Sequence, residues 1–99
     1  MSNLKLSLIL LFFATTIFSV TNISNCQLVN NVTDTVYTLN TTVFGAPFSV
    51  SPFETACFVF NNTSNIIFDC QGNSIIYNGT AGSNDSMWLN STKNITIKN

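Results

Sequence analysis

The stretch Cys57–Cys70, CFVFNNTSNIIFDC, decides how the rest of the chain is interpreted, because the sequence contains it twice. When this stretch is moved forward by 29 residues, Phe58 falls on Met87 and the second copy runs to Asn99. Four pairs of identical residues then coincide: Asn61 with Asn90, Thr63 with Thr92, Asn65 with Asn94, and Ile66 with Ile95. An internal repeat of this length is typical of architectures in which successive copies of one unit stack on each other.

The composition favours strands and turns over helices. Asn and Ser compete for helix hydrogen bonds, and the β-branched residues are stiff at χ1. Short strands are expected at residues 27–29, 35–39 and 74–77, in addition to the two strands within each repeat. Residues 41–52 contain Gly45, Pro47 and Pro52 and are predicted to form a loop or irregular strand, and residues 78–85 a loop. We therefore predict an all-β fold.

Strand, turn, strand, turn, strand and loop describe one coil of a parallel β-solenoid, whose coils lie about 4.8 Å apart. Equivalent residues then lie over one another, and we expect Asn65 and Asn94 to form a hydrogen-bonded ladder. The competing interpretation is a small antiparallel sandwich. Identical residues at a fixed offset argue against it, because hairpins need no repeat.

Residues 57–99 resemble the opening coils of right-handed parallel β-helix proteins, the pectin-lyase-like superfold, and especially its NosD-like repeat proteins. The similar residues are Phe58-Val59-Phe60, the segment NIIFDCQGNSI from Asn65 to Ile75, and Ser91–Asn99, which is similar to the family's repeat unit. The family's helix often begins with a segment of the type N-I-x-L-D-C-x-G-x-x-I. We expect an N-terminal cap or first irregular coil at residues 25–56, followed by β-helix coils at residues 57–99. The resemblance is nearly silent on activity, because the superfold carries lyases, epimerases, adhesins and structural proteins.

Residues 1–24 have the pattern of a secretory signal peptide. Lys5 precedes the uncharged run Leu6–Val20, which is shorter than the roughly 20 residues of a membrane span but suits the apolar region of a signal. Small or polar residues near its end predict cleavage before Asn22 or Asn25. An uncleaved signal anchor and a lipoprotein signal are the alternatives. We expect a secreted or cell-surface protein.

Export makes the glycosylation sequons relevant. Sequons begin at Asn22, Asn31, Asn40, Asn61, Asn62, Asn78, Asn84, Asn90 and Asn94. Their density predicts some glycosylation in a host that has the machinery. Asn78 and Asn84, in the Gly-rich stretch, are the preferred acceptors, and Asn40 and Asn31 are further candidates. In the competing interpretation, these asparagines instead bond backbone groups at turns and strand ends. For Asn65 and Asn94 we prefer a place in the stacked ladder to glycosylation.

Three cysteines in an exported chain predict one disulfide and one remaining thiol. Cys57 and Cys70 lie at the far ends of two strands, beyond the Cα separation of about 4.4–6.8 Å that a disulfide needs. Moving Cys26 forward by 31 residues places it on Cys57, and neighbouring coils hold equivalent Cα atoms about 4.8 Å apart. We predict the disulfide Cys26–Cys57, with Cys70 unpaired. The alternative, a metal site, lacks His and a C-x-x-C motif.

The charged residues limit the chemistry. They make up 7% of the chain, the net charge is −1, and the only cations are three lysines, which excludes a nucleic-acid footprint. Without His, nucleophile–His catalysis is excluded within this chain. The offsets place Asp34 over Asn65 and Asp69 over Lys98, so no carboxylate pair for a glycosidase or a calcium-assisted lyase is formed. Asp69 is expected to cap the following turn, and no cofactor or metal is expected.

Function stays open between two classes. The first is an exported β-solenoid acting as a structural, adhesive or carbohydrate-binding scaffold for a polysaccharide or cell-surface glycan. For this class Trp88 and Tyr77 are candidates for a sugar platform, although such residues more commonly belong to a core or subunit surface. The second is the N-terminal fragment of a polysaccharide lyase or epimerase whose active site lies beyond Asn99.

The repeat stops at Asn99, before the turn and third strand of its coil. We therefore expect a truncated chain whose open C-terminal edge is covered by further coils or by an oligomer. A small secreted disulfide protein, complete at 99 residues, is the third option.

Overall fold

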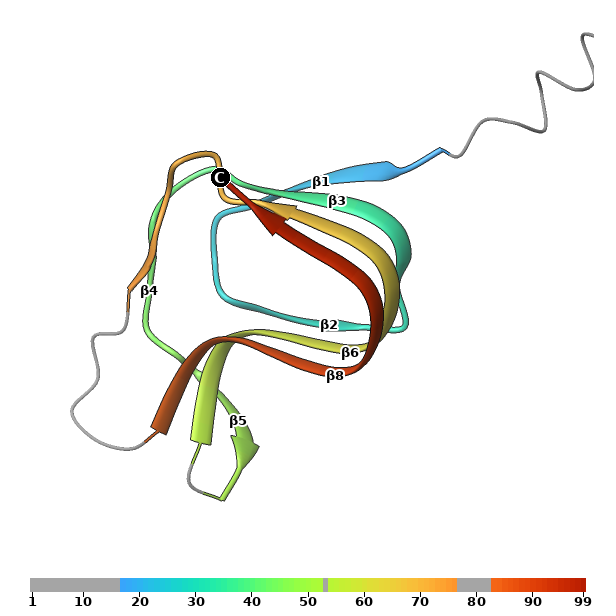
Figure 1. Ribbon diagram of the computed structural model, residues 1–99. Helices are drawn as coiled ribbons and strands as arrows, with labels where there is room; N and C mark the ends of the chain where they lie inside the picture. The colour runs from blue at the N-terminus through green and yellow to red at the C-terminus, as the bar shows by residue number, and fades with distance from the viewer. Residues whose placement is uncertain (1–16, 53, 77–82) are drawn as a thin grey trace, which may run out of the picture.

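A computed structural model describes residues 17–52, 54–76 and 83–99, and every regular element in these ranges is a strand (Figure 1). The strands are β1 (Ser19–Ile23), β2 (Gln27–Asn30), β3 (Thr33–Leu39), β4 (Val43–Phe44), β5 (Phe48–Ser51), β6 (Glu54–Asp69), β7 (Ile75–Ile76) and β8 (Ser83–Lys98). The predicted all-β class is confirmed for this part of the chain. The described residues also contain no helix that is long and apolar enough to cross a membrane.

The main sheet is parallel and curled, so that it wraps around the core like half of a barrel (Figure 1). Its central strand, β6, bends midway along its length. The first half of β6 pairs in parallel with β2, and the second half pairs with β3, which in turn pairs with β1. Strand β8 follows the whole curve of β6 on the other side. A separate two-stranded parallel sheet joins β4 to β7.

The strand registers reproduce the two sequence offsets. Phe58 pairs with Met87 and Asp69 with Lys98, which is the offset of 29. Gln27 pairs with Phe58, which is the offset of 31 between β2 and β6. Equivalent residues therefore lie side by side on neighbouring strands, as the repeat predicts.

The bends of the curled sheet are made by residues with positive φ. One bend has Asn31, Asn62 and Ser91 at φ 58°, 52° and 54°, and three residues later Asp34, Asn65 and Asn94 have φ 52°, 55° and 54°. The left-handed region costs most residues about 1–2 kcal/mol, but Asn and Asp enter it more easily because their side chains bond locally. Equivalent residues bend together, so strand pairing continues through the bend. Strands β6 and β8 are thus single curved strands of 16 residues, whereas the sequence predicted two short strands separated by a turn.

The core lies on the concave side of the curled sheet. Its largest buried side chains are Phe58, Phe60 and Phe68. Phe68 contacts both Phe58 and Phe60 edge to face, and Phe60 contacts Tyr37 in the same way. The ring centroids of Phe58 and Phe68 are 5.0 Å apart, and those of Tyr37 and Phe60 are 5.7 Å apart. Side chains alternate across a strand, so the residues between these aromatics face outward.

Three segments differ from the sequence expectation. Residues 41–52 contain β4 and β5, and β5 pairs antiparallel with the start of β6, with Phe48 opposite Ala56. Strand β8 begins at Ser83, inside the predicted loop 78–85, because it continues the pairing with β6 back to Glu54. Strand β1 lies at the end of the predicted signal peptide, most of which, like Tyr77, is outside the described residues.

Candidate functional site

A groove of about 200 Å³ lies on the outer face of the curled sheet, where β2, β6 and β8 run in parallel with β5 near them. It is lined by Leu28, Ser49, Val50, Val59, Asn61, Trp88 and Asn90. Leu28, Val59 and Trp88 form one row across the three strands, because Leu28 pairs with Val59 and Val59 with Trp88. Since their neighbours Phe58 and Phe60 are buried inside, this row faces outward.

The polar side of the groove is made by carboxamides. Asn61 and Asn90 pair in register two residues beyond Val59 and Trp88, so they lie on the same face. Nδ2 of Asn61 donates to Oδ1 of Asn30 at 3.0 Å. Among the described residues no hydrogen bond joins Asn61 to Asn90, and Asn90 is exposed. The groove therefore offers an aromatic surface flanked by amide donors and acceptors, with no charged side chain in its lining.

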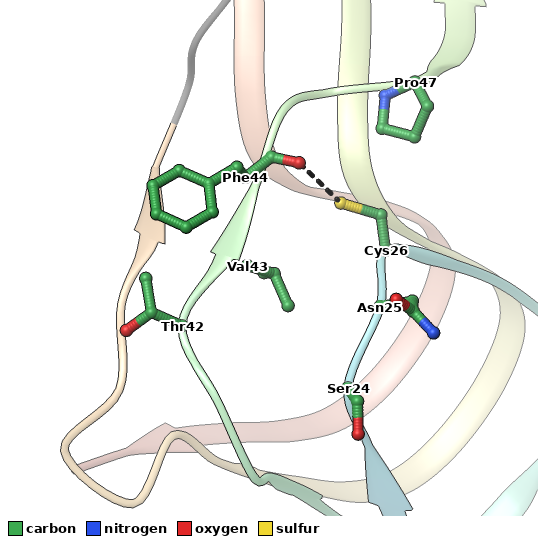
Figure 2. A pocket seen from close by; sticks show the side chains of 7 residues that line it. All are labelled: Ser24, Asn25, Cys26, Thr42, Val43, Phe44 and Pro47. Carbon is green, nitrogen blue, oxygen red and sulfur yellow. Dashed lines mark hydrogen bonds between the residues drawn. The ribbon is translucent and has the colours of Figure 1, made fainter.

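A second hollow, of about 480 Å³, lies between the segment before β2 and strand β4 (Figure 2). Its lining consists of Ser24, Asn25, Cys26, Thr42, Val43, Phe44 and Pro47. The carbonyl oxygens of Phe44 and Gly45 lie 4.0 and 3.8 Å from Sγ of Cys26. A disulfide sulfur carries no proton, so these are S···O contacts rather than hydrogen bonds. This lining contains no titratable group for acid or base chemistry.

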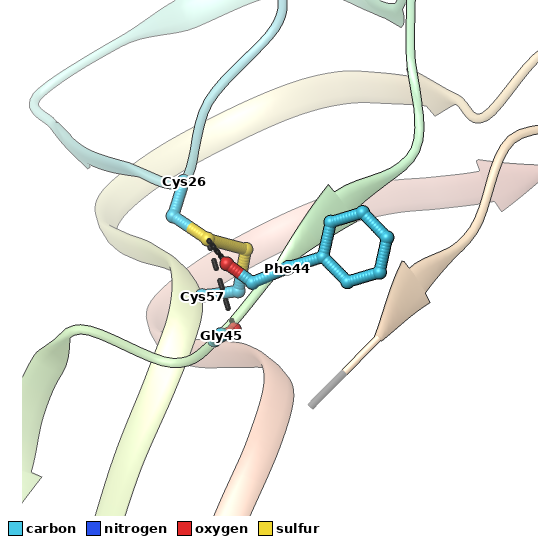
Figure 3. The surroundings of a disulfide bond; sticks show 4 residues. All are labelled: Cys26, Phe44, Gly45 and Cys57. Atoms are coloured by element: carbon cyan, nitrogen blue, oxygen red, sulfur yellow. Dashed lines mark hydrogen bonds between the residues drawn. A yellow bond between two sulfur atoms is a disulfide. The ribbon is translucent and has the colours of Figure 1, made fainter. Parts of the chain in front are cut away.

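The disulfide joins Cys26 to Cys57, the pair that the offset of 31 predicts (Figure 3). The two Cα atoms are 4.7 Å apart, as expected for equivalent positions on neighbouring strands. The bond ties the segment before β2 to the start of the buried part of β6. Cys70 is free and half-buried. Burial raises the pKa of the Cys70 thiol, and the adjacent charge of Asp69 raises it further.

The asparagine ladder includes the two residues predicted for it. Nδ2 of Asn94 donates to Oδ1 of Asn65, and Nδ2 of Asn65 donates to Oδ1 of Asp34, each at 2.9 Å. A parallel rung joins Nδ2 of Asn62 to Oδ1 of Asn31 at 2.8 Å. Side-chain bonds of this kind connect strands that are already paired through their backbones, so they fix the register at the bends.

Asp69 has hydrogen-bond partners at the turn that follows β6. Oδ1 of Asp69 accepts hydrogen bonds from Nδ2 of Asn99 at 3.1 Å and from the backbone N–H of Gln71 at 3.0 Å. These bonds lower the pKa of Asp69, with the bond from Asn99 as the largest cause, and the charge of Lys98 lowers it further. Asp69 thus lies at the turn that it was expected to cap. Within residues 17–52, 54–76 and 83–99, no three potential metal-ligating side chains lie together.

The glycosylation candidates differ in their surroundings. Asn40 is exposed and lies between β3 and β4. Asn31 is exposed but belongs to a rung of the ladder. Asn84, predicted to lie in a loop, is instead a half-buried residue of β8 whose Oδ1 accepts from Oγ1 of Thr55 at 2.7 Å. Asn78 is outside the described residues.

The sequence did not single out Asn61 and Asn90 as binding residues. The signal was present, since both follow outward-facing apolar residues at a spacing of two, but the contribution of β5 to the groove could not be read from the repeat.

No protein-family model matches the chain, and no match is found among curated proteins or solved structures.

Proposed function

We propose that the protein is an exported or cell-surface β-solenoid, the opening of a right-handed parallel β-helix, that serves as a scaffold for binding uncharged carbohydrate. Strands paired at constant offsets, with side-chain ladders at the bends, support the solenoid part of the proposal. The disulfide supports export, because such bonds persist in oxidising compartments.

The observation that carries the carbohydrate assignment is Trp88 beside Asn61 and Asn90 in an outward-facing groove. The flat, apolar face of an indole suits the C–H face of a sugar ring, while its N–H remains able to donate a hydrogen bond. Carboxamides both donate and accept, which matches hydroxyl groups. Since no charge lines the groove, an acidic sugar gains no counterion there, and neutral glycans are the preferred ligands.

Two of the four acidic side chains are engaged in holding the fold together, which favours a scaffold over a catalyst. Asp34 and Asp69 are the hydrogen-bond partners of Asn65 and Asn99 and are occupied in holding strands and turns together. A general acid or base must instead lie within reach of a substrate proton. In this proposal the binding energy comes from the groove and no bond of the glycan is broken.

The test uses the full chain, secreted from a eukaryotic or bacterial host and purified with its disulfide intact. Trp88 is the only tryptophan, so its fluorescence reports directly on the groove. Titration with neutral oligosaccharides such as cello-, manno- and galacto-oligomers is expected to shift the emission, whereas oligogalacturonate is expected to bind more weakly.

Co-sedimentation with insoluble neutral polysaccharides provides the matched comparison. Trp88→Ala is expected to lose binding, and Phe44→Ala, which removes an exposed aromatic on a different sheet, is expected to keep it. The proposal is wrong if no neutral glycan changes the Trp88 signal, or if the two variants bind equally. Cleavage of an acidic polysaccharide by the purified chain would instead support the lyase class.

A further inference from the structure

Strand β1 is part of the folded sheet, although it lies within the predicted signal peptide. It pairs in parallel with β3 over its whole length, from Ser19 opposite Thr35 to Ile23 opposite Leu39. Ile23 has 0% of its surface exposed and belongs to the same core cluster as Leu39. Ile23 is therefore packed into the core of the curled sheet.

Hydrogen bonds beyond the strand pairing also hold this end of the chain. The backbone N–H of Asn40 donates to the carbonyl oxygen of Ile23 at 2.9 Å. Oγ1 of Thr38 lies 3.5 Å from the carbonyl oxygen of Thr21 and also donates to Oδ1 of Asn22. Thr38 is itself buried, so its hydroxyl depends on these partners.

The cleavage positions predicted from sequence conflict with these contacts. Cleavage before Asn25 removes Ile23 from the core and leaves the outer edge of β3 unpaired. Cleavage before Asn22 removes Thr21 and leaves only two residues of the strand. By contrast, a chain that starts at Val20, which is itself 68% exposed, keeps Ile23 in the core and keeps both contacts of Thr38, with Thr21 and with Asn22.

We propose that the leader is removed by hydrolysis of the Ser19–Val20 peptide bond, so that Val20–Ile23 remains as the first strand of the mature protein. This inference rests on the proposed export. A leader peptidase and one water molecule carry out the step: the carbonyl carbon of Ser19 takes the hydroxyl and becomes a carboxyl group, and the nitrogen of Val20 takes the proton and becomes the new α-amine.

The sequence around this bond suits such a peptidase. Leader peptidases require a small residue before the cleaved bond, which Ser19 supplies. The uncharged run before it, Leu6–Phe18, is 13 residues long, within the range of about 7–15 for the apolar region of a signal. Both Ser19 and Val20 are exposed, so the new terminus does not disturb the core.

The direct test is the N-terminal residue of the exported protein. The full chain is expressed in a secretory host, and the mature N-terminal peptide is identified by mass spectrometry. A start at Val20 is the expected result, and any other start, including Asn22 or Asn25, overturns the inference while leaving export intact. Retention of the protein inside the cell with its leader attached would instead contradict the export proposal.

Two matched pairs of variants sharpen the test. Ser19→Phe is expected to block processing, and Ser24→Phe is expected to leave it unchanged; the reverse pattern would show that cleavage occurs before Asn25. Ile23→Ser is expected to raise the unfolding equilibrium constant of the exported protein at least about tenfold, whereas Val20→Ser leaves it unchanged. Equal stability of the last two variants would show that β1 is not part of the folded core.

Discussion

Replacing Asn65 with Ala tests whether the asparagine ladder and the bend stabilise the fold. Asn65 has φ 55° and bonds both Asp34 and Asn94 at 2.9 Å. Alanine would lose two hydrogen bonds, each worth about 0.5–1.5 kcal/mol, and would still have to adopt the left-handed conformation at a cost of at least about 1 kcal/mol. We therefore expect Asn65→Ala to lower the free energy of unfolding by about 2–4 kcal/mol.

A second substitution at the same position separates the two causes. Asn65→Gly also loses both hydrogen bonds, but glycine adopts positive φ without steric cost. After allowance for the greater freedom of glycine in the unfolded chain, we expect Asn65→Gly to be about 1 kcal/mol more stable than Asn65→Ala. Asn40→Ala is the matched control, since Asn40 is exposed and is not at a positive φ; we expect it to change stability by less than about 0.5 kcal/mol.

Urea unfolding followed by the fluorescence of Trp88 gives these differences, provided that the m-value is the same in all variants. The reasoning is refuted if Asn65→Ala is as stable as Asn40→Ala. It is refuted in part if Asn65→Gly and Asn65→Ala are equally destabilised, because the bend would then carry no backbone strain.

Three further predictions concern the disulfide, an acidic side chain and glycosylation. Replacing Cys26 and Cys57 with Ser is expected to lower the free energy of unfolding by about 3.5–4 kcal/mol, because the bond closes a loop over 31 residues, and a fall of less than about 1 kcal/mol in urea unfolding would contradict this. The pKa of Asp69 is lowered in the folded state, so its contribution to the stability of the fold is present above the unfolded pKa near 3.8 and is lost as the pH falls through the folded pKa. Asp69→Asn should therefore reduce the fall of the thermal unfolding midpoint between neutral and strongly acid pH. An acid dependence of the midpoint equal to that of the unmodified protein would contradict this. In a glycosylating host, Asn40→Gln should reduce the intact mass by one glycan while Asn84→Gln causes no such loss, since Asn84 is bonded to its neighbour strand.

The parts of the structure that could be predicted from the sequence are those that follow from a fixed offset. In a stack of parallel strands, residues one repeat apart are neighbours in space, so arithmetic on residue numbers is equivalent to geometry. The pairing of Phe58 with Met87, the ladder from Asn65 to Asn94 and the disulfide partner of Cys57 all follow from the offsets of 29 and 31.

The parts that could not be predicted depend on segments outside the repeat. Strand β5 pairs antiparallel with the start of β6 and brings Ser49 and Val50 to the groove, and no second copy of β5 exists to reveal it. As a result, the sequence does not reveal that Val59, which faces outward on β6, is only 3% exposed. Strand β1 was missed for another reason, since its residues lie at the end of the segment that the sequence assigns to the signal peptide.

The direction of the ladder explains why one of its members is an aspartate. In each rung a carboxamide Nδ2 donates to the oxygen of the residue about one repeat earlier in the chain. A middle member must both donate and accept, which Asn65 does as a carboxamide. An ionised carboxylate can only accept, so within this row it fits only at the N-terminal rung, where Asp34 lies. Because Asp34 and Asn65 also share a positive φ, one small polar residue type serves both the bend and the ladder, and the choice between acid and amide is fixed by position in the row.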